Sequence, residues 1–144
     1  MLSTNPAAGL TLLRVAVGLI FFSHGLSKLF LHVPGQGDLR WVDALVTGLA
    51  SWGFPVPLVL AWSVALLEFA GGITFAAGWL VRPLAAYYAF QILLGIYLVH
   101  GQHGWYTVGP GRNGVEFSVL ILASLATLVV AGHGRPLPRP RFSG

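Results

Sequence analysis

Ionisable side chains are rare in this sequence, and several of them stand inside long apolar segments. The 144 residues contain eight Lys and Arg, four Asp and Glu, and five His. Glu68 lies at the centre of the apolar segment 61–79. The first apolar segment of the chain contains Arg14, His24 and Lys28. A charge within a membrane span is costly and usually faces the interior of a helix bundle, where such groups could bind a polar ligand or transfer protons.

A buried charge pair between Arg14 and Glu68 is the first arrangement that these residues predict. Arg14 keeps its charge and therefore needs an acceptor, and Glu68 at mid-depth needs a partner as well. The small residues beside Glu68 at helical spacing are Ala61, Ala65, Gly72 and Ala76. They would let the first span approach closely. We therefore expect the two side chains to pair, either directly or through a water or Gln91.

A second polar group is expected toward the outward end of the helices. With about 1.5 Å of rise per residue, the candidate ligand-binding residues in this outward third are His24, Lys28, His100, His103, Arg112 and Glu116. His24 and Lys28 are four residues apart and share one helical face. Polar groups that converge beneath an aromatic loop predict a ligand pocket. In the alternative interpretation, Lys28 extends to the membrane interface and His24 is a hydrogen-bonded residue of the bundle.

No metal site is predicted for these residues. His100 and His103 are three residues apart, and His24 and Glu116 could complete a set of ligands, but no short ligand motif such as HExxH is present. Histidines near an interface are more often hydrogen-bonded than metallated. A haem would need axial ligands deeper in the bundle, for which His24 and His100 are the candidates, and this interpretation is not favoured either.

Other kinds of chemistry are excluded by what the sequence lacks. It has no phosphate-cradling loop, dinucleotide motif or nucleophile elbow. It has no Cys, which excludes a disulfide framework, an iron–sulfur cluster and thiol–disulfide catalysis by this chain itself. The net charge is +4, but the basic residues are scattered or lie in the tail, so nucleic-acid binding is not predicted.

The elements that must position these residues are apolar helices. The chain is 56% hydrophobic and 8% charged, whereas a soluble domain has about 25% charged residues. We predict an all-α membrane protein with one domain over residues 1–144, built as a four-transmembrane-helix bundle. The expected spans are 8–30, 56–80, 83–101 and 113–132. A short interfacial amphipathic helix is expected between the first two spans, within residues 32–57, and the alternative there is an ordered loop.

The basic residues predict the orientation of these spans. Arg82 lies between the second and third spans, and Arg135, Arg139 and Arg141 follow the fourth. The positive-inside rule places all of them in the cytoplasm. We therefore expect a multi-pass protein of a bacterial or archaeal inner membrane with both termini cytoplasmic and a mobile tail over residues 133–144.

The sequence resembles the DoxX-like family of four-helix integral membrane proteins. The resemblance rests on LLRVAVGLIFFSHGLSKLF in the first span, with its R…HGxxK pattern, and on LASWGFPVPLVLAWSVALLEFAGGITFAAGW, with its Glu-x-x-Gly-Gly. It continues in GRNGVEFSVLILASLATLVVAGHG, after which this chain has RPLPRPRF where the family often continues differently. Some relatives in this family are subunits linked to quinone reduction, such as the small subunit of thiosulfate:quinone oxidoreductase.

The resemblance implies a redox-linked, quinone-interacting subunit or partner of a membrane oxidoreductase system. The outward cluster of His, Lys and Glu would then hydrogen-bond a quinone carbonyl or move its protons. The alternative is a non-catalytic membrane scaffold or a small-solute transporter, in which Arg14 and Glu68 would be structural or gating charges. The partners expected are the lipid bilayer, a partner oxidoreductase subunit and a second copy of the chain. Whether the chain catalyses a reaction alone is left open.

Overall fold

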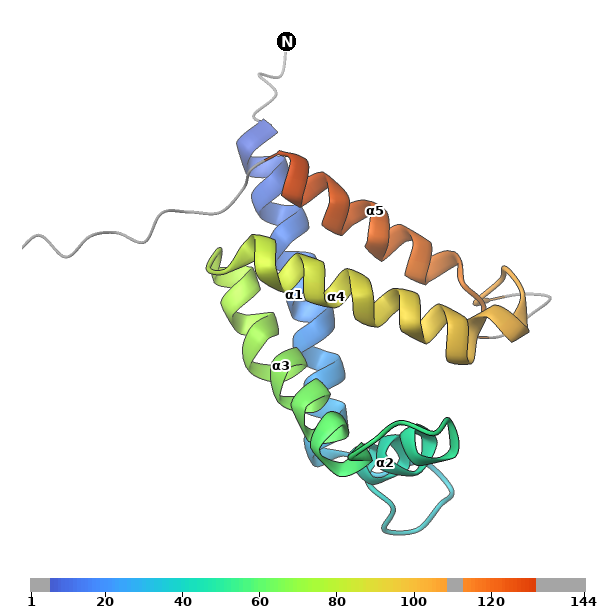
Figure 1. Ribbon diagram of the computed structural model, residues 1–144. Coiled ribbons are helices and arrows are strands. Elements are labelled where there is room, and N and C mark those ends of the chain that lie inside the picture. Colours follow the sequence, from blue (N-terminus) through green and yellow to red (C-terminus); the bar gives the residue numbers. More distant parts are fainter. Residues whose placement is uncertain (1–5, 109–112, 132–144) are drawn as a thin grey trace, which may run out of the picture. The chain divides into compact units, whose positions relative to one another are not determined.

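The computed structural model describes residues 6–108 and 113–131, and within them the chain is helical (Figure 1). The α-helices are α1 (Pro6–Phe30), α2 (Trp41–Ser51), α3 (Pro57–Ala77), α4 (Val81–Gly95) and α5 (Glu116–Val130). A π-helix, η1 (Ile96–His100), continues α4 and is followed by a 3₁₀ turn, η2 (Gly101–His103). The described residues contain no strand, only an isolated bridge between His32 and Arg40. The predicted all-α class is thus confirmed.

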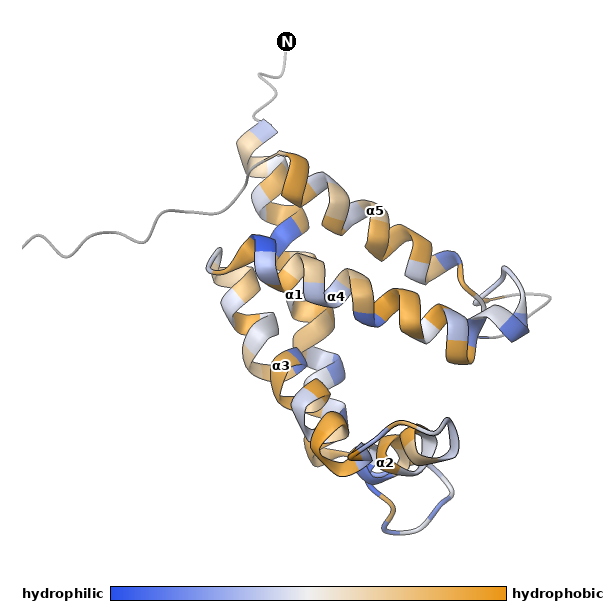
Figure 2. Cartoon of the chain, viewed as in Figure 1, coloured by the Kyte–Doolittle hydropathy of each residue, from blue (hydrophilic) through white to orange (hydrophobic). Residues whose placement is uncertain are grey.

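Three helical segments of the described chain are long and apolar enough to cross a membrane. They are Pro6–Phe30, Pro57–Ala77 and Val81–His103, and apolar residues occupy most of their length (Figure 2). They correspond to the first three predicted spans. The described helix in the fourth predicted span, α5, has 15 residues, which amounts to about 22 Å against a hydrocarbon core of about 30 Å. A count of four spans therefore stays a prediction.

The helices belong to two compact units, which we describe separately. One unit is formed by residues 15–77, and the other by residues up to Arg14 together with the chain from Gly78 onward. In the first unit, α1 and α3 approach at their backbones. A Cβ atom added to Gly25 would lie 2.2 Å from the backbone nitrogen of Phe69, and one on Gly72 would lie 2.4 Å from that of Phe22. Only glycine permits this approach.

The amphipathic helix α2 packs on the beginning of α3. Its buried residues Val42 and Leu49 form a core cluster with Ala61 and Ala65 of α3. The partly buried residues around this cluster are Leu29, Leu45, Val46, Phe54, Leu60 and Trp62. The predicted stripe of small residues therefore contacts two helices. Ala61 and Ala65 meet α2, whereas the two later members, Gly72 and Ala76, meet α1. The helix expected within residues 32–57 is present, and its place at a membrane interface stays a prediction.

In the second unit, α4 packs against α5. The buried residues of α4 are Val81, Leu84, Ala85 and Tyr88, and those of α5 are Ser118, Ile121, Leu125 and Leu128. Both sets recur at intervals of three and four residues, which is the spacing of a single helical face. Each helix thus buries one narrow face and exposes apolar residues elsewhere, as lipid-exposed helices do.

Candidate functional site

The candidate site is an ion pair between Lys28 of α1 and Glu68 of α3. The Lys28 Nζ atom donates to Glu68 Oε2 at 2.5 Å. The carboxylate side chain is 3% exposed and the Lys28 side chain 19%. Such a pair in a region of low dielectric attracts far more strongly than one at the surface, and the loss of either partner would leave the other charge enclosed.

The register of α1 against α3 explains why these two residues meet. The two helices run in opposite directions, so that Gly25 of α1 faces Phe69 of α3, and Gly18 faces Ala76. Glu68 therefore lies at the level of α1 just beyond Gly25. A helical side chain points back toward the N-terminus of its helix, which brings the long Lys28 side chain down to this level.

The sequence-based estimate of depth missed this contact. It assigned Lys28 to the outward third of the first span and Glu68 to the middle of the second. The ion pair shows that the two side chains reach the same level. Gly18, in the middle of α1, faces Ala76 at the end of α3, so the two helices are offset along their axes. Arg14, the partner that was predicted for Glu68, belongs to the other compact unit. The pairing of Arg14 with Glu68 stays a prediction.

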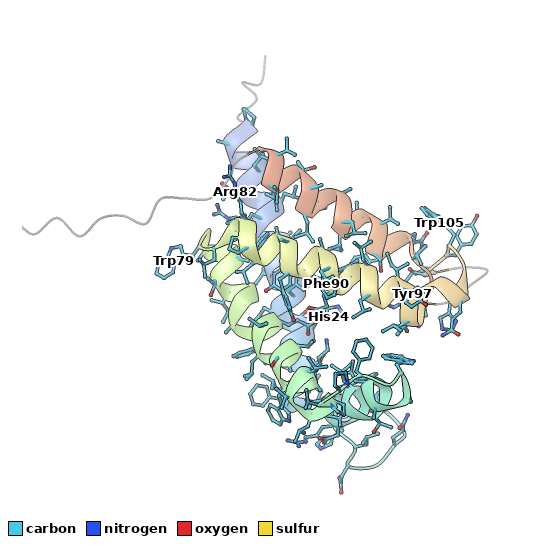
Figure 3. All side chains as sticks on the ribbon, viewed as in Figure 1. His24, Trp79, Arg82, Phe90, Tyr97 and Trp105 are labelled. Atoms are coloured by element: carbon cyan, nitrogen blue, oxygen red, sulfur yellow. The ribbon has the colours of Figure 1, made fainter. Side chains whose placement is uncertain are left out.

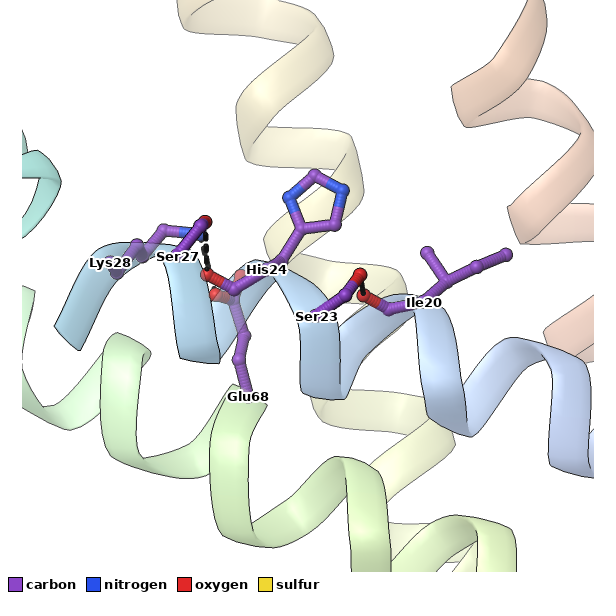
Figure 4. Close-up of polar contacts among 6 residues, drawn as sticks. All are labelled: Ile20, Ser23, His24, Ser27, Lys28 and Glu68. Carbon is purple, nitrogen blue, oxygen red and sulfur yellow. Dashed lines mark hydrogen bonds and ion pairs between the residues drawn. The ribbon is translucent and has the colours of Figure 1, made fainter. Parts of the chain in front are cut away.

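His24 lies one helical turn before Lys28 on α1 (Figure 4). Figure 4 shows the Glu68 side chain rising from α3 toward the turn of α1 that carries both residues. His24 is an exposed side chain in the described structure, and its carbonyl accepts a hydrogen bond of 2.8 Å from Ser27 Oγ. Of the two residues predicted to share this face of α1, Lys28 is the one that the structure joins to the Glu68 carboxylate.

Aromatic rings stand beside the ion pair. Phe69, the neighbour of Glu68 in α3, has its ring centroid 5.1 Å from that of Phe22 and 6.0 Å from that of Phe30. Both partners belong to α1. Phe22 lies two residues before His24, and Phe30 lies two residues after Lys28. Aromatic side chains of both helices therefore flank the residues of the ion pair in the sequence and pack against one another.

Arg14 is buried in the second unit, where its guanidinium lies against Gly78. Arg14 is 5% exposed. A Cβ atom on Gly78 would come within 2.9 Å of both Cζ and Nη1 of Arg14. Gly78 also has a φ of +92°, a conformation that favours glycine. The residue after α3 must therefore be glycine for two independent reasons, its backbone angle and the guanidinium that occupies its side-chain space.

The side chains of Glu116 and His100 form hydrogen bonds with backbone groups of the segment between α4 and α5. Glu116 is the first residue of α5, and its Oε1 atom accepts a hydrogen bond of 2.8 Å from the backbone N–H of Thr107. Its own backbone N–H donates to the Trp105 carbonyl at 3.0 Å. His100 Nδ1 lies 2.9 Å from the carbonyl oxygen of Asn113. Both side chains were predicted as ligand-binding residues, and both hold the loop in shape.

The remaining predicted site residues complete this comparison. His103 is exposed at the end of η2, and Arg112 lies outside the described residues. His24 and Lys28 belong to one compact unit, whereas His100, His103 and Glu116 belong to the other. A single cavity lined by all of them therefore stays a prediction. Within residues 6–108 and 113–131, no group of three or more His, Asp and Glu residues could hold a metal ion.

The long apolar helices and the ion pair between two of them are typical of an integral membrane protein. The sequence profile named DoxX matches residues 9–101, so the chain belongs to the DoxX family. It is 30% identical over 129 residues to "Inner membrane protein YphA" of Escherichia coli (strain K12), covering 87% of this chain and 84% of that protein.

A second relative carries an enzymatic name. The chain is 29% identical over 124 residues to "Putative oxidoreductase CatD" of Bacillus subtilis (strain 168), covering 86% of this chain and 79% of that protein. No solved structure matches the chain. The family and the membrane class that the sequence predicted are thus confirmed.

Proposed function

We propose that this protein is a redox-linked inner-membrane subunit that binds a quinone beside Lys28, Glu68 and His24 and serves a membrane oxidoreductase system. The observation that carries the proposal is the enclosed ion pair between two apolar helices. Ionisable groups kept within a membrane segment usually mark a site of function. The name of the relative from Bacillus subtilis, which includes the word oxidoreductase, supports the choice of redox chemistry.

The side chains present fit a quinone. Its carbonyl oxygens accept hydrogen bonds, and its ring needs apolar or aromatic neighbours. The Lys28 ammonium has three N–H donors, of which Glu68 uses one, so donors remain for a carbonyl oxygen. Phe69, together with Phe22 and Phe30, offers the ring surface. A bound quinone would carry electrons and protons. Lys28 would orient its carbonyl group, and Glu68 would hold the Lys28 ammonium in place.

The proposed topology has four spans with both termini in the cytoplasm. In this arrangement α5 is the core of the fourth span, and α2 lies at the outward interface. The exposed rings of Trp41 and Trp52 at the two ends of α2 support the interfacial position, because Trp is enriched where membrane meets water. The buried residues Val42 and Leu49 on the other face of α2 would hold it against the bundle.

Quinone binding by the purified protein tests the proposal. The full chain would be reconstituted in lipid nanodiscs and titrated with decylubiquinone, and lipid extracts of the purified protein would be analysed for quinone. We expect binding by the wild type and a loss of affinity in Lys28→Gln and His24→Ala. Ser23→Ala is the matched control, because Ser23 Oγ donates only to the carbonyl of Ile20 within the same helix. The absence of binding by the wild type would refute the proposal, as would equal binding by all variants.

A scaffold or small-solute transporter is the second candidate function. It is favoured by the way that Lys28 and Glu68 compensate each other, since such a pair can fix helix register without binding a ligand. The glycine contacts between α1 and α3 are equally those of a rigid structural core. Solute uptake by proteoliposomes in the absence of quinone binding would favour a transporter over the redox subunit, and an absence of both activities would favour a scaffold.

A further inference from the structure

The end of α4 departs from α-helical geometry at a histidine. Residues Ile96–His100 form the π-helix η1, and the N–H of Gly101 donates to the carbonyl of Ile96, five residues earlier. A Cβ atom on Gly101 would lie 2.8 Å from that same oxygen, so the turn needs a glycine there. π-helical turns are rare and occur frequently at functional sites. His100 is the last residue of this turn.

The structure fixes the direction of hydrogen bonding by the His100 ring. Its Nδ1 atom lies 2.9 Å from the carbonyl oxygen of Asn113. A carbonyl oxygen can only accept, so Nδ1 carries a proton. In the neutral imidazole, Nε2 is then a hydrogen-bond acceptor, with its orientation held by the bond on the other nitrogen. The adjacent ring atom Cδ2 lies 3.9 Å from the position of a Cβ on Gly95, so that a large side chain at position 95 would approach this edge of the ring.

Hydrogen bonds join the described residues on the two sides of the loop that carries Asn113. Gly114 N–H donates to the Tyr106 carbonyl at 3.1 Å, and Val115 N–H donates to the Gly104 carbonyl at 3.1 Å. Thr107 is fixed at both its amide and its hydroxyl, by the Glu116 carboxylate at 2.8 Å and the Gly114 carbonyl at 3.0 Å. The carbonyl that positions His100 therefore belongs to a preorganised element, which lowers the cost of binding a ligand.

Aromatic side chains are exposed around this turn. Tyr97 is 84% exposed, and Trp105 and Tyr106 are each about half exposed. Figure 3 shows Tyr97 and Trp105 at the same end of α4. Tyr and Trp rings combine a flat apolar face with a polar edge, and they offer stacking surface to a planar ligand. A fixed acceptor beside such rings suits a ring that itself carries a hydroxyl group.

We infer that the η1 turn is a second binding site, at which His100 Nε2 accepts a hydrogen bond from a hydroxylated aromatic ring of the quinol class. Lys28 donates to carbonyl oxygens, as the oxidised ring has, whereas His100 accepts from hydroxyl groups, as the reduced ring has. The site therefore selects for the reduced form. The choice of a quinol as the ligand rests on the proposed function, but the geometry of the acceptor does not.

Binding of decylubiquinol to the full chain in nanodiscs, under anaerobic conditions, tests this inference. We expect His100→Ala to weaken binding roughly two- to tenfold, the loss of one hydrogen bond. His103→Ala is the matched control, because His103 lies three residues away and is exposed. Gly95→Leu should weaken binding to a similar degree by covering the Nε2 edge, while it leaves the bond from Nδ1 intact. The dimethyl ether of the quinol, which has no donor, should bind equally to the wild type and to His100→Ala.

An independent readout comes from the nitrogen-15 spectrum of the imidazole. We expect Nδ1 protonated and Nε2 unprotonated, with a shift of the Nε2 signal when decylubiquinol is added. A proton on Nε2, equal binding by His100→Ala and wild type, or equal losses in His100→Ala and His103→Ala would each overturn the inference. If decylubiquinone binding still depended on Lys28 in that case, the proposed function would stand. If the wild type bound neither decylubiquinone nor decylubiquinol, both this inference and the proposed function would be overturned.

Discussion

Lys28 Nζ and Glu68 Oε2 lie 2.5 Å apart, although the two residues are forty positions apart in the sequence. The contact joins the two helices of the first unit, α1 and α3. A second ion pair, Arg40 with Asp43, lies at the start of α2.

The first prediction is that Lys28 and Glu68 are energetically coupled. Lys28→Met and Glu68→Gln should each lower the free energy of unfolding by about 3–5 kcal/mol, because each removes the opposite charge from an enclosed ionised group. The double variant should lose less than the sum of the two. The measurement is a double-mutant cycle on thermal unfolding in detergent.

The matched control for this cycle is the pair of Arg40 and Asp43. Its side chains are 41% and 38% exposed, and exposed pairs contribute about 0–1 kcal/mol. Strictly additive losses at Lys28 and Glu68 would show that their contact has no energetic consequence.

A second prediction concerns the close contact of α1 with α3. Gly25→Ala should destabilise the protein strongly, because its Cβ would lie 2.2 Å from the backbone of Phe69, which cannot move aside alone. Gly9→Ala is the control, since Gly9 lies in the same helix with nothing within 4 Å. There, alanine should be neutral or stabilise by up to about 1 kcal/mol. Equal melting temperatures for both variants would contradict the packing described for this seam.

The third prediction separates the two reasons for glycine at position 78. Gly53 has a φ of +77° and open space around it, whereas Gly78 has a φ of +92° and meets the guanidinium of Arg14. Gly53→Ala should pay only the backbone cost of about 1–2 kcal/mol. Gly78→Ala should lose more, and the excess should shrink when Arg14 is also changed to Ala. If Gly78→Ala were no worse than Gly53→Ala, the guanidinium would have moved away at no cost.

The fourth prediction concerns Glu116 as the residue that closes the loop before α5. Glu116→Ala removes the acceptor of the Thr107 amide and should speed hydrogen exchange at that amide by roughly tenfold, the value of one charge-assisted hydrogen bond. Glu116→Gln keeps an acceptor oxygen and should have a smaller effect. Exchange followed by mass spectrometry on the loop peptide measures this. Slow exchange at Thr107 in Glu116→Ala would show that the loop closes without the carboxylate.

A fifth prediction addresses topology. A reporter that is active only in the cytoplasm should be active when it is fused after the last residue of the chain, because Arg82 and the basic residues of the tail favour the cytoplasmic side. The same reporter inserted after Gly35, where the loop has open space, should be inactive. Activity at the second position alone would reverse the proposed orientation.

The apolar helices could be predicted from the sequence with fair accuracy. The second span was expected over residues 56–80 and the helix runs over Pro57–Ala77, because proline favours a first turn and Gly78 ends the helix with a positive φ. The third was expected to end at residue 101, and the helical segment ends at His103. The π-turn within it has no hydropathy signal, so no sequence pattern could have located it.

The site was predicted only in part, because contacts between helices depend on register. The shared face of His24 and Lys28 follows from their spacing alone. The meeting of Lys28 with Glu68 depends on which glycine of α1 faces which residue of α3, and one sequence does not contain that information. The structural roles of Glu116 and His100 were missed for a similar reason, since their partners are backbone groups of a loop.

The order in which Lys28 and Glu68 are synthesised gives their contact a consequence for biogenesis. At about 5–20 residues per second, the ribosome needs about 2–8 s to extend the chain by the forty positions that separate Lys28 from Glu68. Over that interval the nascent first span has its ammonium but not the carboxylate that will neutralise it. If α1 and α3 pair before they enter the bilayer, they enter it as a hairpin in which these two charges neutralise each other.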